Sequence, residues 1–211
     1  MGQKVNPNAF RLPVSKDWES RWFTPRKSDY TDTLIEDIKL RKLLFNELKH
    51  AMVARVEIER SIRRVDITIH VARPGVAIGR GGEELTKLKK KIEAFFSGKK
   101  QQLKIEIKIE PVKKPDLDPY LVAVNIAEQL KRRMPHKRVV AMAMERVMNA
   151  GGKGVKVALG GRIAGAEIAR HEKYSRGSVP LSTIRENVRF AKFPALTKSG
   201  YVGVKVWICI E

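Results

Sequence analysis

Apolar and polar residues alternate along three segments of the first half of the chain, and each alternation predicts a half-buried β-strand. These segments are residues 53–60, 64–72 and 103–109. A helix is predicted over residues 32–50, where four leucines share one face, namely Leu40, Leu43, Leu44 and Leu48. A short helical turn over 76–78 and a helix from Glu83 to about Gly98 complete this half. The order helix, strand, strand, short helix, loop, helix, strand predicts a small α+β unit whose helices cover one face of the sheet.

The pattern changes after residue 118. Asp118 followed by Pro119 is a strong helix start, because aspartate caps free N–H groups and proline fits the first helical position. An apolar stripe follows at Ala123, Ile126, Ala127, Leu130 and Met134. Pro135 interrupts it, and a second helix is predicted over 136–150. Strands are predicted over 155–159, 168–174, 184–192 and 201–210. Two helices followed by antiparallel strands predict a two-layer α/β sandwich.

These patterns divide the chain into four parts. They are a basic N-terminal arm over 1–30, an α+β domain over 31–112, a polar linker over 113–118 and the sandwich domain over 119–211. The arm contains Trp18, Trp22 and Phe23. These aromatic side chains either anchor the arm on the first domain or stack on bases, and anchoring is the favoured interpretation.

The charge of the chain narrows the choice of partner. Lysine and arginine number 43 against 23 aspartate and glutamate residues, so the formal net charge is +20. Such an excess repels itself in the folded state and indicates a polyanionic partner, either nucleic acid or an anionic membrane surface. Hydrophobic residues make up 43% of the chain, which is enough to build a core and excludes a disordered basic tail. Nucleic acid is the favoured partner.

A glycine-rich loop gives that partner a candidate site. Gly79, Arg80, Gly81 and Gly82 form a G-x-x-G segment behind an apolar residue, the spacing with which one class of RNA-binding module clamps about four nucleotides. A dinucleotide fingerprint would need a third glycine where Glu84 stands. The glycines of residues 160–165 have P-loop spacing but lack the lysine and hydroxyl residue that follow in a P-loop. Neither nucleotide-binding hypothesis survives.

The densest basic cluster straddles Pro135. It contains five cations, Lys131, Arg132, Arg133, Lys137 and Arg138. Cations are favourable at a helix C-terminus, so a solvated helix end is one explanation. A patch that binds phosphates, with the bidentate geometry of arginine, is the other and is favoured.

Residues typical of catalysis or metal binding are sparse. The four histidines are scattered, and the single cysteine, Cys209, can form neither an intrachain disulfide nor a zinc site. Residues 1–12 do not resemble a secretory signal, and no apolar run approaches the length that spans a bilayer. We therefore predict an intracellular, non-enzymatic protein without cofactor, metal, membrane or small-molecule substrate.

Six segments resemble the ribosomal protein S3 family of the bacterial small subunit, and the resemblance extends over essentially the whole chain. They are residues 1–8 with Arg11 and Leu12, 72–75, 78–83, 161–170, 179–181 and 203–208.

This resemblance implies a type II KH domain near residues 39–110, followed by a C-terminal domain. It implies contacts with small-subunit rRNA in the head of the particle, with neighbouring proteins and with mRNA at the entry channel. Lys4, Arg11 and Arg162 lie in matching segments and are candidate RNA contacts. Lys137 and Arg138 occupy two basic positions that help to open mRNA helices, whereas Ala141 replaces a third, usually lysine.

A second function hypothesis is a free-standing KH protein that acts as an RNA chaperone or regulator. The basic arm and the second full domain favour a ribosomal component.

Overall fold

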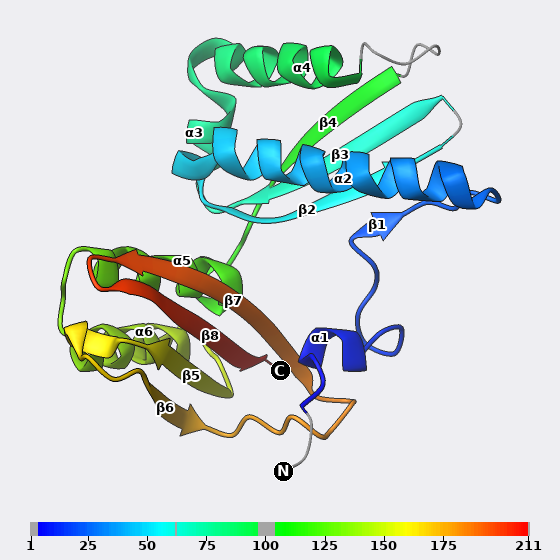
Figure 1. Ribbon diagram of the computed structural model, residues 1–211. Helices are drawn as coiled ribbons and strands as arrows, with labels where there is room; N and C mark the ends of the chain where they lie inside the picture. The colour runs from blue at the N-terminus through cyan, green and yellow to red at the C-terminus, as the bar shows by residue number, and fades with distance from the viewer. Residues whose placement is uncertain (1–3, 62, 97–103, 211) are drawn as a thin grey trace. The chain divides into compact units, whose positions relative to one another are not determined.

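The structure is a computed structural model that describes residues 4–61, 63–96 and 104–210. The chain forms two compact units, shown in Figure 1. The central unit is Trp18–Lys113. The terminal unit combines Met1–Asp17 with Lys114–Glu211. The sequence predicted one arm over residues 1–30, but the two halves of that segment belong to different units.

A four-stranded sheet forms the centre of the central unit. Its strands are β1 (Ser20–Arg21), β2 (Val53–Arg60), β3 (Arg64–Val71) and β4 (Lys104–Pro111), in that spatial order. The β2–β3 pair is antiparallel, and the two outer pairs are parallel. Buried and half-buried residues alternate along most of β3, which confirms the period-two pattern of the sequence.

Three helices complete the central unit, and one hydrophobic core lies between them and the sheet. They are α2 (Lys27–Glu47), α3 (Pro74–Ile78) and α4 (Glu83–Phe96). Leu40 and Leu44 of α2 are fully buried and pack with Leu88 and Ile92 of α4. The predicted leucine face is therefore the face that meets the core.

The start of α2 differs from the prediction. The helix begins at Lys27 rather than near residue 32, and Thr31 Oγ1 bonds the carbonyl of Lys27 inside its first turns. Thr31 and its neighbours therefore do not cap the helix. After Glu47 the chain tightens into a 3₁₀ turn, Lys49–Ala51. The predicted helix end at Gly98 and strand start at Leu103 lie outside the described residues.

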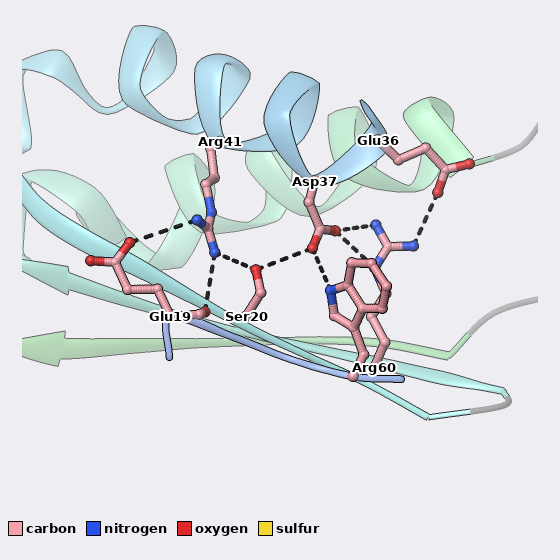
Figure 2. Close-up of polar contacts among 7 residues, drawn as sticks. Glu19, Ser20, Glu36, Asp37, Arg41 and Arg60 are labelled. Atoms are coloured by element: carbon pink, nitrogen blue, oxygen red, sulfur yellow. Dashed lines mark hydrogen bonds and ion pairs between the residues drawn. The ribbon is translucent and has the colours of Figure 1, made fainter. Parts of the chain in front are cut away.

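Within the central unit, a buried polar cluster ties the segment around Trp22 to helix α2 and strand β2 (Figure 2). Asp37 on α2 is 2% exposed, and one of its carboxylate oxygens accepts a hydrogen bond from Trp22 Nε1 at 2.8 Å. The other oxygen accepts from Arg60 Nε at 2.8 Å and from a second guanidinium nitrogen of the same residue. Trp22 therefore anchors the chain, as predicted, whereas Trp18 and Phe23 are 63% and 88% exposed.

The terminal unit has two layers, helices and an antiparallel sheet (Figure 1). Its sheet has the spatial order β6-β5-β8-β7, with strands β5 (Gly154–Gly161), β6 (Arg170–Gly177), β7 (Asn187–Thr197) and β8 (Gly200–Ile210). The helices α5 (Pro119–Lys131) and α6 (His136–Asn149) pack on one face of it, and the short α1 (Pro7–Phe10) contacts β7. This arrangement confirms the predicted α/β sandwich.

In this unit, the sequence predicted the start of helix α5 more accurately than the end of the edge strand β7. Asp118 caps α5, since its side chain accepts hydrogen bonds from the N–H groups of Tyr120 and Leu121 at 2.9 and 3.2 Å. β7 was predicted to end at residue 192, but it continues through Pro194 to Thr197. Proline is tolerated there because β7 is at the edge of the sheet.

Candidate nucleic-acid interface

The G-x-x-G loop connects α3 to α4 in the central unit. Gly79, Gly81 and Gly82 have φ values of +73°, +61° and +80°, in the left-handed region that favours glycine. Arg80 is exposed between them. The loop therefore presents bare backbone and one cation, which is the chemistry that a sugar-phosphate chain can approach closely.

The two outer glycines of this loop have different surroundings. A Cβ on Gly79 would lie 2.8 Å from Cγ of Glu84, so a larger residue there would collide with the start of α4. A Cβ on Gly82 would meet no atom within 4 Å. Gly79 is therefore required by the packing of the loop, whereas Gly82 leaves open space above the backbone.

We expect Gly82→Asp to weaken RNA binding at this loop by more than about tenfold and to cost about 1–2 kcal/mol of stability. The aspartate would place a negative charge where a phosphate approaches, whereas the open space at Gly82 limits the loss of stability to backbone strain. RNA affinity and thermal melting of the full chain measure the two effects. Gly82→Ala is the matched control, because it adds similar strain without charge. Unfolding of both variants would instead make Gly82 a residue of the fold.

The five-cation cluster lies at the corner between α5 and α6, and we call it the basic corner: Lys131, Arg132, Arg133, Lys137 and Arg138. All five side chains are exposed, and within the described part of the chain none forms an ion pair. The sequence predicted that Pro135 would separate the helices, and the structure confirms it. The turn therefore gathers uncompensated positive charge at one place.

Arg133 is the turning point of the basic corner. Its φ is +61°, and its N–H bonds the carbonyl of Leu130 at 2.9 Å while that of Met134 bonds the carbonyl of Gln129 at 3.2 Å. This is the Schellman arrangement, in which glycine is the usual residue because a left-handed conformation costs other residues about 1–2 kcal/mol. An arginine at this strained position indicates that its guanidinium is needed at the corner.

Lys137 and Arg138 lie in the first turn of α6, where positive charge is unfavourable because it faces the positive end of the helix dipole. That turn has no acidic residue and no side-chain cap. The explanation of a solvated helix end, which suits Lys131 at the C-terminus of α5, therefore does not extend to these two residues. Two cations beside free N–H groups favour binding of an anion.

A cleft of about 360 Å³ opens beside the basic corner. Three cations from separate segments line it, Arg133 of the corner, Arg162 after β5 and Lys198 in the β7–β8 turn. Arg162 is exposed, and its Nε donates to the carbonyl of Ala166 at 2.8 Å. The sequence singled out Arg133 and Arg162 separately but missed Lys198, because only the fold brings these three residues together.

The start of α6 is positioned by a polar contact with β6. His136 Nε2 lies 3.0 Å from Oε2 of Glu172, which also accepts a 2.5 Å hydrogen bond from the Tyr174 hydroxyl. That hydrogen bond, with the charges of His136 and Arg170, lowers the pKa of Glu172. Burial and the bond to Glu172 raise the pKa of Tyr174 to about 12. Glu172 therefore remains a carboxylate at neutral pH and holds the His136 side chain beside the cleft.

Arg11 is a correction to the predicted RNA contacts. It is fully buried, and its guanidinium donates five hydrogen bonds to backbone carbonyls at 2.8–3.2 Å. These carbonyls belong to Pro7, Pro180, Leu181, Thr183 and Glu186. Because the side chain is fully buried and all three of its nitrogens donate inside the fold, it cannot reach a phosphate, and Arg11 joins the N-terminal segment to residues 180–186. Lys4 is exposed.

Across residues 4–61, 63–96 and 104–210, no group of histidine, cysteine, aspartate and glutamate side chains could hold a metal ion. Over the same residues, every helix is too short or too polar to cross a membrane.

Each half of the chain matches a known protein family. Residues 39–117 match the family described as KH domain, and residues 126–208 match the family described as ribosomal protein S3, C-terminal domain. The small ribosomal subunit protein uS3 of Lactobacillus gasseri is 45% identical over 208 residues, which cover 99% of this chain and 90% of the relative. The protein of the same name from Staphylococcus aureus is 46% identical and covered to 93%.

The chain belongs to the uS3 family. Its central unit thus contains a KH domain, in which the loop between α3 and α4 is the G-x-x-G loop. Its terminal unit contains the S3 C-terminal domain, with the basic corner at the junction of its two helices. The fold class and the family resemblance predicted from the sequence are both confirmed.

Proposed function

We propose that this uS3 family member is a structural constituent of the small ribosomal subunit in the cytoplasm. It binds rRNA in the head of the particle, contacts neighbouring subunit proteins and lines the path by which mRNA enters. The relatives are named as small ribosomal subunit proteins, which supports the first part. The proposed role uses no catalytic group, cofactor, membrane or small-molecule substrate.

The basic corner is the observation that supports the mRNA contact. It presents exposed cations without ion-pair partners among the described residues, and two of them face an unfavourable helix dipole. Residues held against such a local cost are expected to gain their stabilisation from a partner. Lysine and arginine can hold a single strand through its phosphates, independently of sequence. Arg162 and Lys198 extend the same surface around the cleft.

Sedimentation distinguishes this function from that of a free-standing KH chaperone. In cell extracts at high magnesium concentration, we expect the full chain to sediment with small subunits and to remain with them after a wash at moderate salt. A chain found mainly in the light fractions, with RNA fragments but without subunits, would favour the chaperone alternative and contradict the proposed role.

We also expect steep salt dependence when the isolated chain binds RNA. With a net charge of +20, neutralisation of about 6–10 phosphates should lower the affinity by about 10³–10⁵-fold between 50 and 200 mM salt. A titration of RNA binding at several salt concentrations gives the slope. Affinity that stays constant over this range would show that released counterions do not drive the interaction.

A further inference from the structure

We propose that the uncovered face of the terminal sheet is a second RNA-binding surface, which takes a single-stranded segment. The helices α5 and α6 pack on the opposite face (Figure 1), where Val155, Val157 and Val206 enter the core. Along β8 the alternate residues Tyr201, Gly203 and Lys205 are exposed, whereas their neighbours are buried. Around Lys205 the face that they share is open to solvent among the described residues, whereas its far end is covered, since Val188 and Cys209 on the same side are fully buried. The face belongs to neither the G-x-x-G loop nor the basic corner.

Strand register arranges three lysines in one row across this face. Lys173 of β6 pairs with Ala158 of β5, Ala158 pairs with Lys205 of β8, and Lys205 pairs with Lys192 of β7. Directly paired residues of antiparallel strands point to the same side of the sheet. All three lysines are exposed, and none forms an ion pair with another described residue. The row is therefore a line of positive charge across the whole sheet.

The Lys192–Lys205 pair is unfavourable for the isolated fold. Like charges directly opposite each other on adjacent strands destabilise a sheet, since their Cβ atoms lie only about 4.5–5.5 Å apart. On the strands themselves, no described position of this face is aspartate or glutamate: Glu172 of β6 pairs with Leu159 and points to the helix side. Glu186, just before β7, lies 3.6 Å from Cys209 Sγ at the covered end of the face and is paired with Lys153 at 2.8 Å. The charge is thus uncompensated locally, and a polyanion on the face would relieve the repulsion.

The rows beside the lysines carry aromatic rings and bare backbone. On one side, the rings of Phe190 and Trp207 lie 5.1 Å apart, and the ammonium of Lys156 lies 5.8 Å from the indole. On the other side, Gly160 pairs with Gly203; the imidazole of His171 lies over Gly160, so it is Gly203 of β8 that presents its backbone. Beyond them Tyr201 is 68% exposed at the end of β8.

This combination favours RNA over an acidic protein surface. An acidic protein would need only the lysines, whereas the exposed ring of Tyr201 provides a stacking platform for an unpaired base, beside the half-buried rings of Phe190 and Trp207. Glycine backbone between the cations and Tyr201 lets a nucleotide lie close to the sheet. The occupant that uses all three features is a single strand, with phosphates along the lysine row and a base on Tyr201.

The test uses the full chain and a fluorescent oligouridylate of twelve nucleotides, which forms no helix. The inference rests on the proposed RNA-binding function, but it concerns a separate face. We expect Lys192→Gln with Lys205→Gln to weaken binding about tenfold and to reduce the salt slope by about 1.4, because each single-strand phosphate contact contributes about 0.7. Tyr201→Ala should weaken binding about tenfold through lost stacking, and Tyr201→Phe should retain it.

The matched control is Lys89→Gln with Lys104→Gln. It removes the same net charge from lysines that lie 4.0 and 3.3 Å from glutamate oxygens in the central unit. Its effect on the salt slope should be small. Thermal melting at low salt should show the Lys192/Lys205 variant at least as stable as the parent chain, because like-charge repulsion is removed.

The inference would be overturned by equal slopes for the two double variants or by tighter binding to polyglutamate than to the oligonucleotide. A lower melting temperature of the Lys192/Lys205 variant that accounts for its weaker binding would also overturn it. A parent chain that enters small subunits but does not bind oligouridylate would overturn this inference alone. A chain that does neither would contradict the proposed function as well.

Discussion

Replacing Asp37 by alanine is expected to lower the free energy of unfolding of the KH domain by about 3 kcal/mol. Asp37 is buried, and its carboxylate accepts hydrogen bonds from Trp22, Ser20 and Arg60 (Figure 2). Removing it leaves the guanidinium of Arg60, whose side chain is 9% exposed, without its main partner. Glu36 still lies 3.0 Å from Arg60, which holds the loss to the lower end of the range for a broken buried pair.

The measurement is urea unfolding of the full chain, followed by hydrogen exchange of backbone amides. Exchange should accelerate for the β2–β3 pair of the KH domain and stay unchanged for β5 and β8 of the terminal unit. Asp32→Ala is the matched control, because Asp32 is an exposed aspartate on the same helix and its loss changes the net charge equally. Its effect should stay within about 0.5 kcal/mol.

Asp37→Asn separates charge from shape. The amide keeps a carbonyl acceptor of nearly the same size but cannot neutralise Arg60, so we expect a loss between those of the other two variants. Equal stability of the Asp37→Ala and Asp32→Ala proteins would show that the cluster does not hold the Trp22 segment in place.

Regular patterns in the sequence predicted the elements that obey a period. Val65, Ile67 and Ile69 alternate with polar residues and form the buried side of β3, and Leu40 and Leu44 mark the core face of α2. Such predictions succeed because one residue in two along a strand, or one in three to four along a helix, must leave water if the element is to pack. The N-cap of α5 was predicted correctly because it depends only on local sequence: the Asp118 side chain accepts hydrogen bonds from N–H groups two and three residues away.

Features that depend on distant partners were missed. β1 has only two residues and no period, and it exists because Ser20 and Arg21 pair with Ile58 and Glu59. Arg11 was predicted as an RNA contact because it is a cation in a segment that resembles the family. Its carbonyl partners are mostly about 170 residues away in the chain. Nothing local distinguishes a cation that binds carbonyls inside the fold from one that binds phosphate.

In the candidate interface, too, residues that are close in the sequence were predicted, whereas residues that only the fold brings together were not. The G-x-x-G loop and the basic corner are contiguous in the sequence, so composition and spacing identified them. Lys198 reaches the cleft only because the β7–β8 turn brings it beside Arg162. The pairing of Lys192 with Lys205 depends on the register of that hairpin, and a shift of one residue would move the lysines to opposite faces.

Replacing Lys137 and Arg138 together by alanine is expected to slow translation of a structured message more than translation of an unstructured one. Both residues lie on the first turn of α6 beside Arg132 and Arg133, where cations hold a strand without reading its sequence. An opened single strand can place its phosphates against the basic corner, whereas a duplex cannot do so to the same extent. These contacts therefore stabilise the opened strand relative to the duplex. The protein would thus assist unwinding passively, without a bound nucleotide.

The assay compares elongation on two messages of equal length, one with a stable hairpin downstream, using subunits that carry either the parent chain or the variant. We expect about a tenfold weaker hold on the strand, which corresponds to about 1.4 kcal/mol for the two lost phosphate contacts together, and unchanged assembly. The control is Lys104→Ala with Lys108→Ala, which removes two exposed cations from β4 of the KH domain.

Adding a cation to the same surface is the complementary test. Ala141 is exposed on α6, three residues after Arg138 and four after Lys137, so Ala141→Lys extends the cations along one face of the helix. It should shorten the delay at the hairpin and leave the unstructured message unaffected. Equal slowing of both messages by the double alanine variant, or its failure to enter the subunit, would assign Lys137 and Arg138 to assembly. A lysine at 141 that changes neither message, beside a double variant that slows only the structured one, would confine the mRNA contact to the first turn of α6.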